Sequence, residues 1–307
     1  NKVYLNKAGE NWVVDRFRRE WYSEKSEISS RYAFNASSIW LIAPWTWKKM
    51  KKKHLEKKRV ICTIHHIDED KFDENAKKDF YSRDKFVDIY HAISLNTKNQ
   101  LSKYTKKPIV TIPFWINNNI WFQIHKKEYL FEKYKLPNDS FLIGSFQRDT
   151  EGHDLQKPKL SKGPDQFVEI IKYFKISKKN IHIILTGKRR DYLLRKLEEI
   201  GVDYSYFKMT NFKELNELYN CLDLYVVASR VEGGPQSIME CGLNKTPIIS
   251  TNVGIAPEIL SPESIFNMTN FRKAKPNIKI AFDNVQKYLI PKGFDNFIKM
   301  LELDNES

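Results

Sequence analysis

Two glutamates flank a glycine-rich turn in the stretch EGGPQSIME, which begins at Glu232 and ends at Glu240. Gly233 and Gly234 let a ligand approach the backbone closely, and Pro235 suits the first position of a helix. The start of a helix offers free N–H groups and a partial positive charge, which together bind phosphate. The spacing therefore suits a ligand with a diphosphate between two groups that are rich in hydroxyls.

Three polar side chains of the predicted helix lie on nearly one face. Gln236 and Glu240 are four residues apart, and Ser237 is three residues before Glu240. If this face lines the site, Glu240 can accept hydrogen bonds from the diol of a ribose, and Glu232 meets a second polyol. A capped helix with two surface glutamates fits the same residues, and the physical pattern alone leaves both interpretations open.

Short apolar runs alternate with amphipathic stretches along the whole chain. A first series of runs predicts strands at 2–5, 39–44, 59–66, 88–94 and 108–113. A second series predicts strands at 141–146, 181–187, 222–229 and 247–251. Helix-like stretches lie between them, at 10–24, 96–106, 164–174, 191–201 and 212–221. Strands that alternate with helices imply parallel sheets with helices on both faces.

A segment with three consecutive asparagines and two prolines, residues 113–140, separates the two series. We therefore predict an N-terminal domain over residues 1–114 and a C-terminal domain over 115–307, whose last helix packs back on the first domain. Ligands of such sheets bind outside the carboxyl ends of the strands. Two such domains face to face would enclose a cleft.

The glycine-rich stretch resembles the donor-site motif of GT-B glycosyltransferases, in particular of the retaining family 4 (group 1). The hallmark of that family is a Glu, seven intervening residues and a second Glu, as at Glu232 and Glu240. The following CGLNKTPIISTNVGIAPEIL, with Gly254 and Glu258, is also similar to the family. The resemblance covers the second domain well and the first poorly. It implies an α/β GT-B architecture, with two Rossmann-like, doubly wound parallel-sheet domains that face a central cleft.

The resemblance also implies a basic pair that neutralises the diphosphate of the donor. In FLIGSFQRDTEGHDLQKPKLSKGPDQF, residues 141–167, Arg148 and the pair Lys162-Gly163 match these roles. The spacing between them is longer than the family's usual few residues. Cations suit this position because the leaving nucleotide gains negative charge in the transition state. The alternative for Lys162 is an ordinary solvated lysine, in a chain with 52 Lys and Arg.

The nucleobase of the donor should bind near the ends of neighbouring strands. Candidates are Gly187 and Lys188, which follow the run IHIILTG, and Lys208 and Met209 in YFKMTNF. Such residues are as often plain loop residues.

The first domain offers weaker signals on the acceptor side. His65 and His66 stand at the carboxyl end of a predicted strand, where the family often has a His that touches the donor sugar. Successive strand residues point to opposite faces, so one of the two faces the site; we favour His66 as the catalytic one. The alternative is that the two histidines only cap the end of the strand and have no catalytic role. Gly9, in the first loop, marks a close approach of substrate, although the family's paired glycines are missing.

The formal charge of +14 favours an anionic partner. The basic run WKKMKKKHLEKKR, residues 47–59, lies beside Trp45. A solvated helix or loop explains it, and a patch that binds an anionic membrane surface is the functional alternative. No apolar run is long enough to span a bilayer. We expect a cytoplasmic protein that contacts the inner face of the membrane.

Several classes of protein lack support in the sequence. The dinucleotide-binding pattern G-x-G-x-x-G, a phosphate loop and G-x-S-x-G are missing. No cluster of His, Cys and carboxylates has metal-ligand spacing, and we interpret Asp68-Glu69-Asp70 as a solvated acidic loop. The prediction is an enzyme without a metal or a cofactor.

The sequence as a whole predicts a transferase that moves a sugar, with retention, from a UDP- or GDP-sugar to a hydroxyl of a glycan or lipid-linked acceptor. Assembly of a surface glycan or polysaccharide is the expected setting. A sugar-nucleotide epimerase or phosphorylase relative, a non-catalytic sugar-binding relative and a nucleic-acid-modifying enzyme of the same fold remain alternatives. Nucleic acid is the less favoured partner because no nucleic-acid-binding motif is evident.

Overall fold

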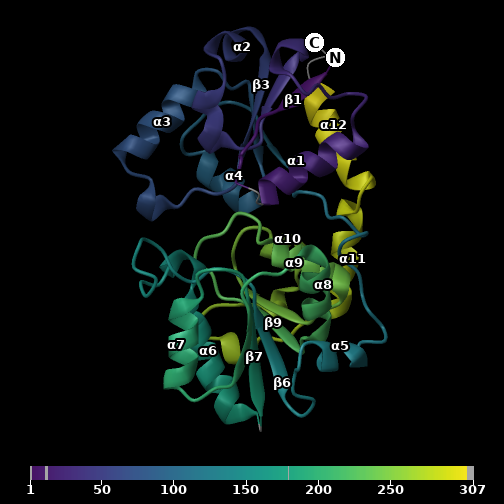
Figure 1. Ribbon diagram of the computed structural model, residues 1–307. Helices are drawn as coiled ribbons and strands as arrows, with labels where there is room; N and C mark the ends of the chain where they lie inside the picture. The colour runs from purple at the N-terminus through teal and green to yellow at the C-terminus, as the bar shows by residue number, and fades with distance from the viewer. Residues whose placement is uncertain (1, 11–12, 179, 303–307) are drawn as a thin grey trace. The chain divides into compact units, whose positions relative to one another are not determined.

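The structure is a computed structural model that describes residues 2–10, 13–178 and 180–302. The chain divides into two compact units (Figure 1). Unit 1 consists of Asn1–Phe114 together with Pro291–Ser307, and unit 2 consists of Trp115–Ile290.

Unit 1 contains a five-stranded parallel sheet in the order β1-β2-β3-β4-β5. Its strands are β1 (Val3–Leu5), β2 (Ser38–Leu41), β3 (Arg59–Ile64), β4 (Ile89–Ala92) and β5 (Ile109–Thr111). Its α-helices are α1 (Val13–Glu24), α2 (Lys52–Lys57), α3 (Glu74–Asp84), α4 (Leu95–Leu101) and α12 (Asp295–Glu302). Val3 of β1 also forms a parallel bridge with Ser29, on the edge of β1 that does not face β2. Backbone pairing therefore lies on both sides of β1, as in a doubly wound sheet.

Unit 2 contains a six-stranded parallel sheet in the order β11-β10-β9-β6-β7-β8. Its strands are β6 (Phe141–Ser145), β7 (Ile181–Thr186), β8 (Tyr204–Phe207), β9 (Leu224–Val227), β10 (Ile248–Thr251) and β11 (Ile265–Phe266). Its α-helices are α5 (Glu128–Lys133), α6 (Pro164–Ser177), α7 (Asp191–Glu199), α8 (Phe212–Cys221), α9 (Gln236–Asn244), α10 (Ala256–Ile259) and α11 (Ile278–Val285).

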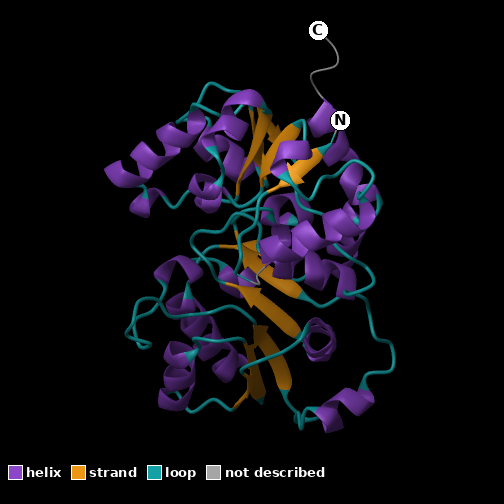
Figure 2. Cartoon of the chain, turned by 45° about the horizontal axis from the view of Figure 1, so that its top comes forward, coloured by secondary structure: helices purple, strands orange, loops and turns teal. Residues whose placement is uncertain are grey.

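Successive residues of the unit 2 strands pack into two different cores, because strand side chains alternate between the faces of a sheet. Ile143 of β6 packs with apolar residues of α6 and α7, whereas Leu142 packs with those of α8, α9 and α11. The strands are therefore buried on both faces, which explains their nearly continuous hydrophobicity. Figure 2 shows strands with helices on either side in each unit.

The core of unit 1 is rich in aromatic rings. Trp40 of β2 stacks on Phe297 of α12 with ring centroids 5.3 Å apart, and Trp21 of α1 meets Trp40 edge to face at 5.3 Å. The guanidinium of Arg59 donates hydrogen bonds to the backbone carbonyls of Met300 and Leu301. These contacts attach α12 to the first sheet.

The expectation of two parallel α/β sheets is confirmed. Each of the nine predicted strands overlaps an observed one, but the predictions missed β8, β11 and helices such as α3. The helix after the glycine-rich turn begins at Gln236, with Pro235 as its N-cap, one residue later than expected. Residues 11 and 12 of the first predicted helix lie outside the described residues.

The basic run at 47–59 forms the end of a 3₁₀ helix, Pro44–Lys49, the short helix α2 and the start of β3. Within this run the side chain of Leu55 is buried, while Lys51, Lys52 and Lys53 are exposed. None of the helices in the described parts of the chain is both long enough and apolar enough to cross a bilayer.

Candidate functional site

The strand order of unit 2 brings two distant segments together at one edge of the sheet. The chain runs from β6 outward to β7 and β8, and then returns to β9 on the other side of β6. Ile143 pairs with Leu224 in the resulting β6–β9 ladder. Because both strands are parallel, the loop after β6 and the loop after β9 meet at their carboxyl ends. Such a switch point in strand order is where open α/β sheets bind ligands.

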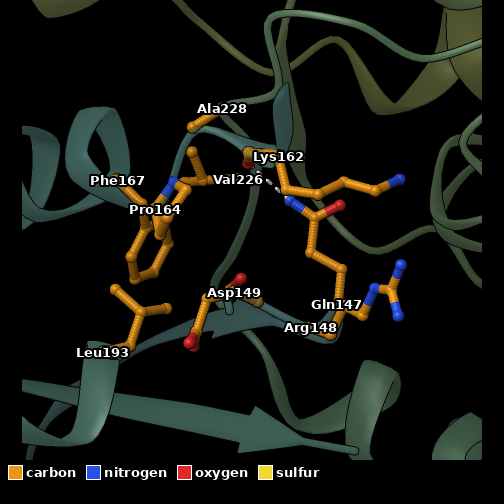
Figure 3. Close-up of a pocket in the computed structure, with 10 residues that line it drawn as sticks. Gln147, Arg148, Asp149, Lys162, Pro164, Phe167, Leu193, Val226 and Ala228 are labelled. Atoms are coloured by element: carbon orange, nitrogen blue, oxygen red, sulfur yellow. Dashed lines mark hydrogen bonds between the residues drawn. The ribbon is translucent and has the colours of Figure 1, made fainter. Parts of the chain in front are cut away.

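The long insertion between Arg148 and Lys162 folds back on itself. The backbone N–H of Lys159 donates to the carbonyl of Asp149 at 2.7 Å, which closes residues 149–159 into a loop with adjacent ends. Arg148 and Lys162 consequently line the same small pocket. In Figure 3 their side chains extend to the same side, away from Phe167. The longer spacing between the two basic residues therefore does not separate them.

Gly163 holds this basic turn against the end of β9. Its backbone is left-handed, with φ 63° and ψ 38°, and a Cβ atom there would lie 1.7 Å from the carbonyl oxygen of Ala228. The amide of Gln166 donates to the same oxygen at 2.6 Å. Only glycine fits this close approach, and it fixes the backbone that carries Lys162.

Lys162 and Glu232, 70 residues apart in the sequence, form an ion pair. The hydroxyl of Ser229 donates to Oε1 of the same carboxylate at 3.2 Å. The side-chain amide of Gln147 donates to the backbone carbonyl of Lys162 at 3.0 Å. The side chains of Lys162 and Glu232 are only 24% and 10% exposed.

The burial of this ion pair has an energetic consequence. Taking charges out of water is costly, and the mutual attraction of the two groups offsets that cost only while both are present. The sequence assigned Lys162 to a diphosphate and Glu232 to a sugar, and the structure places the two side chains in direct contact. They form one hydrogen-bonded unit with Ser229 at the switch point.

The start of α9 has the features of an anion site. Its N-cap, Pro235, provides no side-chain hydrogen bond, and no acidic residue lies in its first turn. The turn before the helix packs on Gly254, where a Cβ atom would lie 2.0 Å from the carbonyl oxygen of Gly233. The close contact with Gly254 therefore fixes the backbone just before the helix start, where the partial positive charge of the helix lies. The side-chain amide of Gln236 donates to the carbonyl of Gly234 at 3.4 Å.

Glu240 is buried one turn into α9, with 5% of its surface exposed. The hydroxyl of Tyr219, on α8, donates to its Oε2 at 2.8 Å. Burial, and then the Glu240 carboxylate, raise the pKa of Tyr219 well above its ordinary value, so the phenol keeps its proton. Ser237 shares a side-chain hydrogen bond with Tyr225 of β9. The polar face expected for α9 is thus oriented by tyrosines that the sequence did not indicate.

The nucleobase candidates lie at the ends of β7 and β8, beyond β6 from the glycine-rich turn. Gly187 has φ 86°, and its carbonyl accepts a hydrogen bond from the Tyr206 hydroxyl at 2.9 Å. Lys188 follows it and is exposed, as are Lys208 and Met209 after β8. Since β7 and β8 are neighbours, the two pairs of candidates stand at adjacent strand ends.

One buried group near the site was missed from the sequence. Arg190, at the start of α7, is fully buried and its Nε donates to Oδ2 of Asp149 at 3.0 Å. Its Nη1 also donates to the carbonyls of Ser145 and Thr186 at 2.6 and 2.7 Å. Burial raises the pKa of Asp149 to about 6 and lowers that of Arg190, so desolvation outweighs the pairing for both groups. Arg190 fixes the backbone next to Arg148, and nothing in the sequence distinguished it from the other basic residues.

The acceptor-side candidates lie in unit 1. Nε2 of His65 donates to the carbonyl of Ile42 at 2.9 Å, and its ring stacks on Phe114 at 5.9 Å. Burial lowers the pKa of His65 to about 4, so this ring is neutral. His66 is exposed, and Gly9 has φ 75° with its N–H donating to Asp15 at 3.3 Å. Among residues 2–10, 13–178 and 180–302, no three His, Cys, Asp or Glu side chains form a group that could hold a metal ion.

Residues 157–299 match the family model for glycosyl transferases group 1. The matched region contains Lys162, Glu232 and Glu240, and it ends within α12. A search of curated proteins found no match by sequence. The family match confirms the resemblance to group 1 glycosyltransferases that the sequence indicated.

Solved structures resemble nearly the whole chain. Anabaena Alr3699/HepE, crystallised with UDP, is 12% identical with a TM-score of 0.74, over 99% of this chain and 100% of its own. Sucrose-phosphate synthase from Thermosynechococcus elongatus is 13% identical with a TM-score of 0.69, over 94% and 76% of the two chains. A glycosyltransferase from Rickettsia africae is 16% identical with a TM-score of 0.63, over 98% and 84%. The chain therefore has the GT-B fold, as the sequence predicted.

Proposed function

We propose that this protein is a glycosyltransferase that moves a sugar from a nucleoside diphosphate sugar to a hydroxyl acceptor, with retention. The observation that carries the proposal is the cluster at the switch point of unit 2. There Lys162 pairs with Glu232, Arg148 lines the same pocket as Lys162, and the glycine-rich turn leads into the uncapped start of α9. Cations and the start of a helix beside a carboxylate suit a substrate that is part phosphate and part sugar.

The reaction breaks the bond between the anomeric carbon of the sugar and the diphosphate oxygen. The leaving diphosphate gains negative charge, which Lys162, Arg148 and the start of α9 stabilise. The acceptor oxygen forms the new bond to the anomeric carbon, and its proton passes to the leaving diphosphate on the same face of the sugar. Glu232 accepts hydrogen bonds from the sugar hydroxyls and Glu240 from the ribose.

The remaining site residues fall into two groups. Gly187, Lys188, Lys208 and Met209 border the nucleobase, at the ends of β7 and β8. In unit 1, His66 is the proposed catalytic residue, and His65 and Gly9 are the proposed acceptor-side residues. Neither a metal nor a cofactor takes part in the proposed mechanism, since the charge on the diphosphate is met by side chains and helix N–H groups.

UDP-glucose is the first donor to test, because structures of Anabaena Alr3699/HepE contain UDP or UDP-glucose. GDP-sugars are the second choice. We propose a glycan or lipid-linked acceptor and a role in surface polysaccharide assembly. The exposed lysines of the run at 47–59 would then bring a cytoplasmic enzyme to the anionic inner face of the membrane.

The test compares Lys162→Ala and Glu232→Gln with a matched control. Lys172 on α6 pairs with Glu169 at 2.7 Å but on the exposed surface, so Lys172→Ala removes a similar pair outside the site. With UDP- and GDP-sugars and a panel of hydroxyl acceptors, Lys162→Ala should lower kcat by roughly 100-fold or more. Lys172→Ala should behave as the wild type. Turnover at the wild-type rate in both site variants would refute the site assignment.

The same assay separates transfer from its alternatives. Release of free nucleotide that requires the acceptor supports transfer. Conversion of the sugar nucleotide without an acceptor would indicate an epimerase relative instead.

A further inference from the structure

Trp45 is an exposed aromatic side chain at the carboxyl edge of the unit 1 sheet. It follows β2 in the 3₁₀ helix Pro44–Lys49, and 48% of its surface is exposed. Its indole N–H donates to Oε1 of Glu10 at 3.1 Å, and Glu10 belongs to the loop that follows β1. The centroid of the indole ring lies 5.7 Å from that of the ring of His65, which follows β3. An aromatic face and a carboxylate thus stand side by side at the ends of adjacent strands.

The backbone beneath this pair is fixed by buried hydrogen bonds. Asn6, which is 2% exposed, donates to the carbonyl of Ala43 at 2.8 Å and to the hydroxyl of Thr46 at 2.9 Å. It also accepts from the N–H of Ala43 at 3.0 Å. Thr46 in turn donates to the carbonyl of Lys7 at 2.9 Å. The loop after β1 is therefore bonded to the loop after β2 at several points.

A second set of bonds fixes the backbone of Glu10. The carboxylate of Asp15 accepts from the N–H of Gly9 at 3.3 Å and from the N–H of Glu10 at 2.9 Å. Binding to a rigid pair costs less side-chain entropy than binding to mobile groups, so this arrangement suits recognition.

The geometry points to a sugar-binding subsite formed by Trp45 and Glu10, which holds one pyranose residue of the acceptor. A pyranose presents C–H groups on one face and hydroxyls at its rim. The negative face of the indole attracts the C–H face, and the carboxylate accepts a hydrogen bond from a rim hydroxyl. This inference rests on the proposed transferase function, and it assigns the acceptor to the class of glycans whose terminal residue is a pyranose.

An anionic membrane surface is the competing occupant, because the lysines of the run at 47–59 follow Trp45 in the chain. The contact with Glu10 favours the sugar. The Glu10 carboxylate beside the indole would repel anionic lipid headgroups. It also accepts the hydrogen bond of the indole N–H, which is therefore occupied and does not bond to groups in the headgroup layer.

The test is a binding measurement on the full chain with methyl α- and β-glycosides of glucose, galactose, mannose and N-acetylglucosamine, by ligand-observed NMR. At least one glycoside should bind the wild type. Trp45→Ala should weaken it about tenfold or more, and Glu10→Ala should weaken it severalfold. Trp45→Phe keeps an aromatic face and should retain part of the affinity.

Phe34→Ala is the matched control. Phe34 is 65% exposed, and it precedes β2 in the chain, whereas Trp45 follows this strand. The control should bind the glycoside as the wild type does. Equal glycoside affinity in the wild type and Trp45→Ala would overturn the subsite. So would loss of binding to phosphatidylglycerol-containing vesicles in Trp45→Ala with unchanged glycoside affinity.

Calorimetric titration of the same proteins with UDP and GDP separates this inference from the proposed function. Trp45→Ala should bind nucleotide as the wild type does and should raise the KM for the acceptor while leaving that for the donor unchanged. A wild type that binds a glycoside through Trp45 but binds no nucleotide would refute the transferase proposal and leave the subsite standing. Normal transfer by Trp45→Ala at an unchanged acceptor KM would refute the subsite alone.

Discussion

Replacement of Gly163 by alanine tests whether the turn that carries Lys162 is held against the end of β9. Gly163 has φ 63°, a left-handed conformation that costs a residue with a side chain about 1–2 kcal/mol. The new Cβ atom would lie 1.7 Å from the carbonyl oxygen of Ala228. An ordinary C···O contact is roughly 3.3 Å, so two backbone segments would have to separate.

The cost of that separation can be estimated from the contacts involved. Overpacking of this kind costs about 1–3 kcal/mol, and the movement would break the bond from Gln166 to Ala228, worth about 1 kcal/mol. Together with the backbone strain, Gly163→Ala should destabilise unit 2 by about 4 kcal/mol. For a unit of this size, that loss lowers Tm by roughly 10 °C.

Gly152→Ala is the control for Gly163→Ala. Gly152 has a similar φ of 71°, but apart from its two neighbours in the chain no residue has a heavy atom within 4 Å of the position of its Cβ. It should lose only the strain, about 1 kcal/mol or roughly 3 °C. Calorimetry gives both Tm values, and titration with UDP tests whether displacement of Lys162 also weakens nucleotide binding. An equal loss of Tm in the two variants, with unchanged UDP affinity, would refute the reasoning.

Three further predictions concern buried polar groups. Tyr219→Phe removes the hydroxyl that bonds to Glu240, and it should weaken UDP binding about fivefold in calorimetry. The binding of 2′-deoxy-UDP should weaken less, and equal losses for the two nucleotides would contradict a ribose site at Glu240. Burial lowers the pKa of His91 to about 3, so only the unfolded chain takes up its proton below about pH 6.5. The contribution of His91 to stability should therefore be complete above pH 6.5 and fall by about 2 kcal/mol at pH 5, and His91→Asn should remove this part of the pH dependence in denaturant titrations. Arg190→Met leaves Asp149 buried without its cation and should lower the free energy of unfolding by about 3–5 kcal/mol. The double variant with Asp149→Asn should regain part of this loss, and a double variant less stable than Arg190→Met would contradict the prediction.

The sequence predicted most strands because their signals are local. Runs such as LDLYVVAS are apolar and bounded by turn residues, and β9 lies within this one. The missed strand β8, YSYF, has no such run, and its residues are only half-buried. The two residues of β11 are too short for any periodicity. Pairing with a neighbouring strand makes these segments strands, and pairing cannot be read from one segment alone.

The candidate site likewise combines features that have a local signal in the sequence with contacts that depend on the tertiary structure. The spacing of Glu232 and Glu240 around two glycines indicated a helix start that favours phosphate, and the observed α9 begins within one residue of that prediction. The contact of Lys162 with Glu232 could not be predicted from local pattern, nor could that of Tyr219 with Glu240. These contacts depend on which strands and helices become neighbours.

By itself, the sequence determined the alternation of strands and helices, the glycine-rich turn and the carboxylates on either side of it. These features follow from hydrophobic period and turn chemistry, which act over a few residues. Only the tertiary structure decided that β9 returns beside β6, which places Lys162 on Glu232 across 70 residues. It likewise decided that the loops after β1 and β2 are bonded together, which sets Trp45 against Glu10. The physical reason is that strand order is selected by the burial of both faces of a sheet, a property of the whole unit.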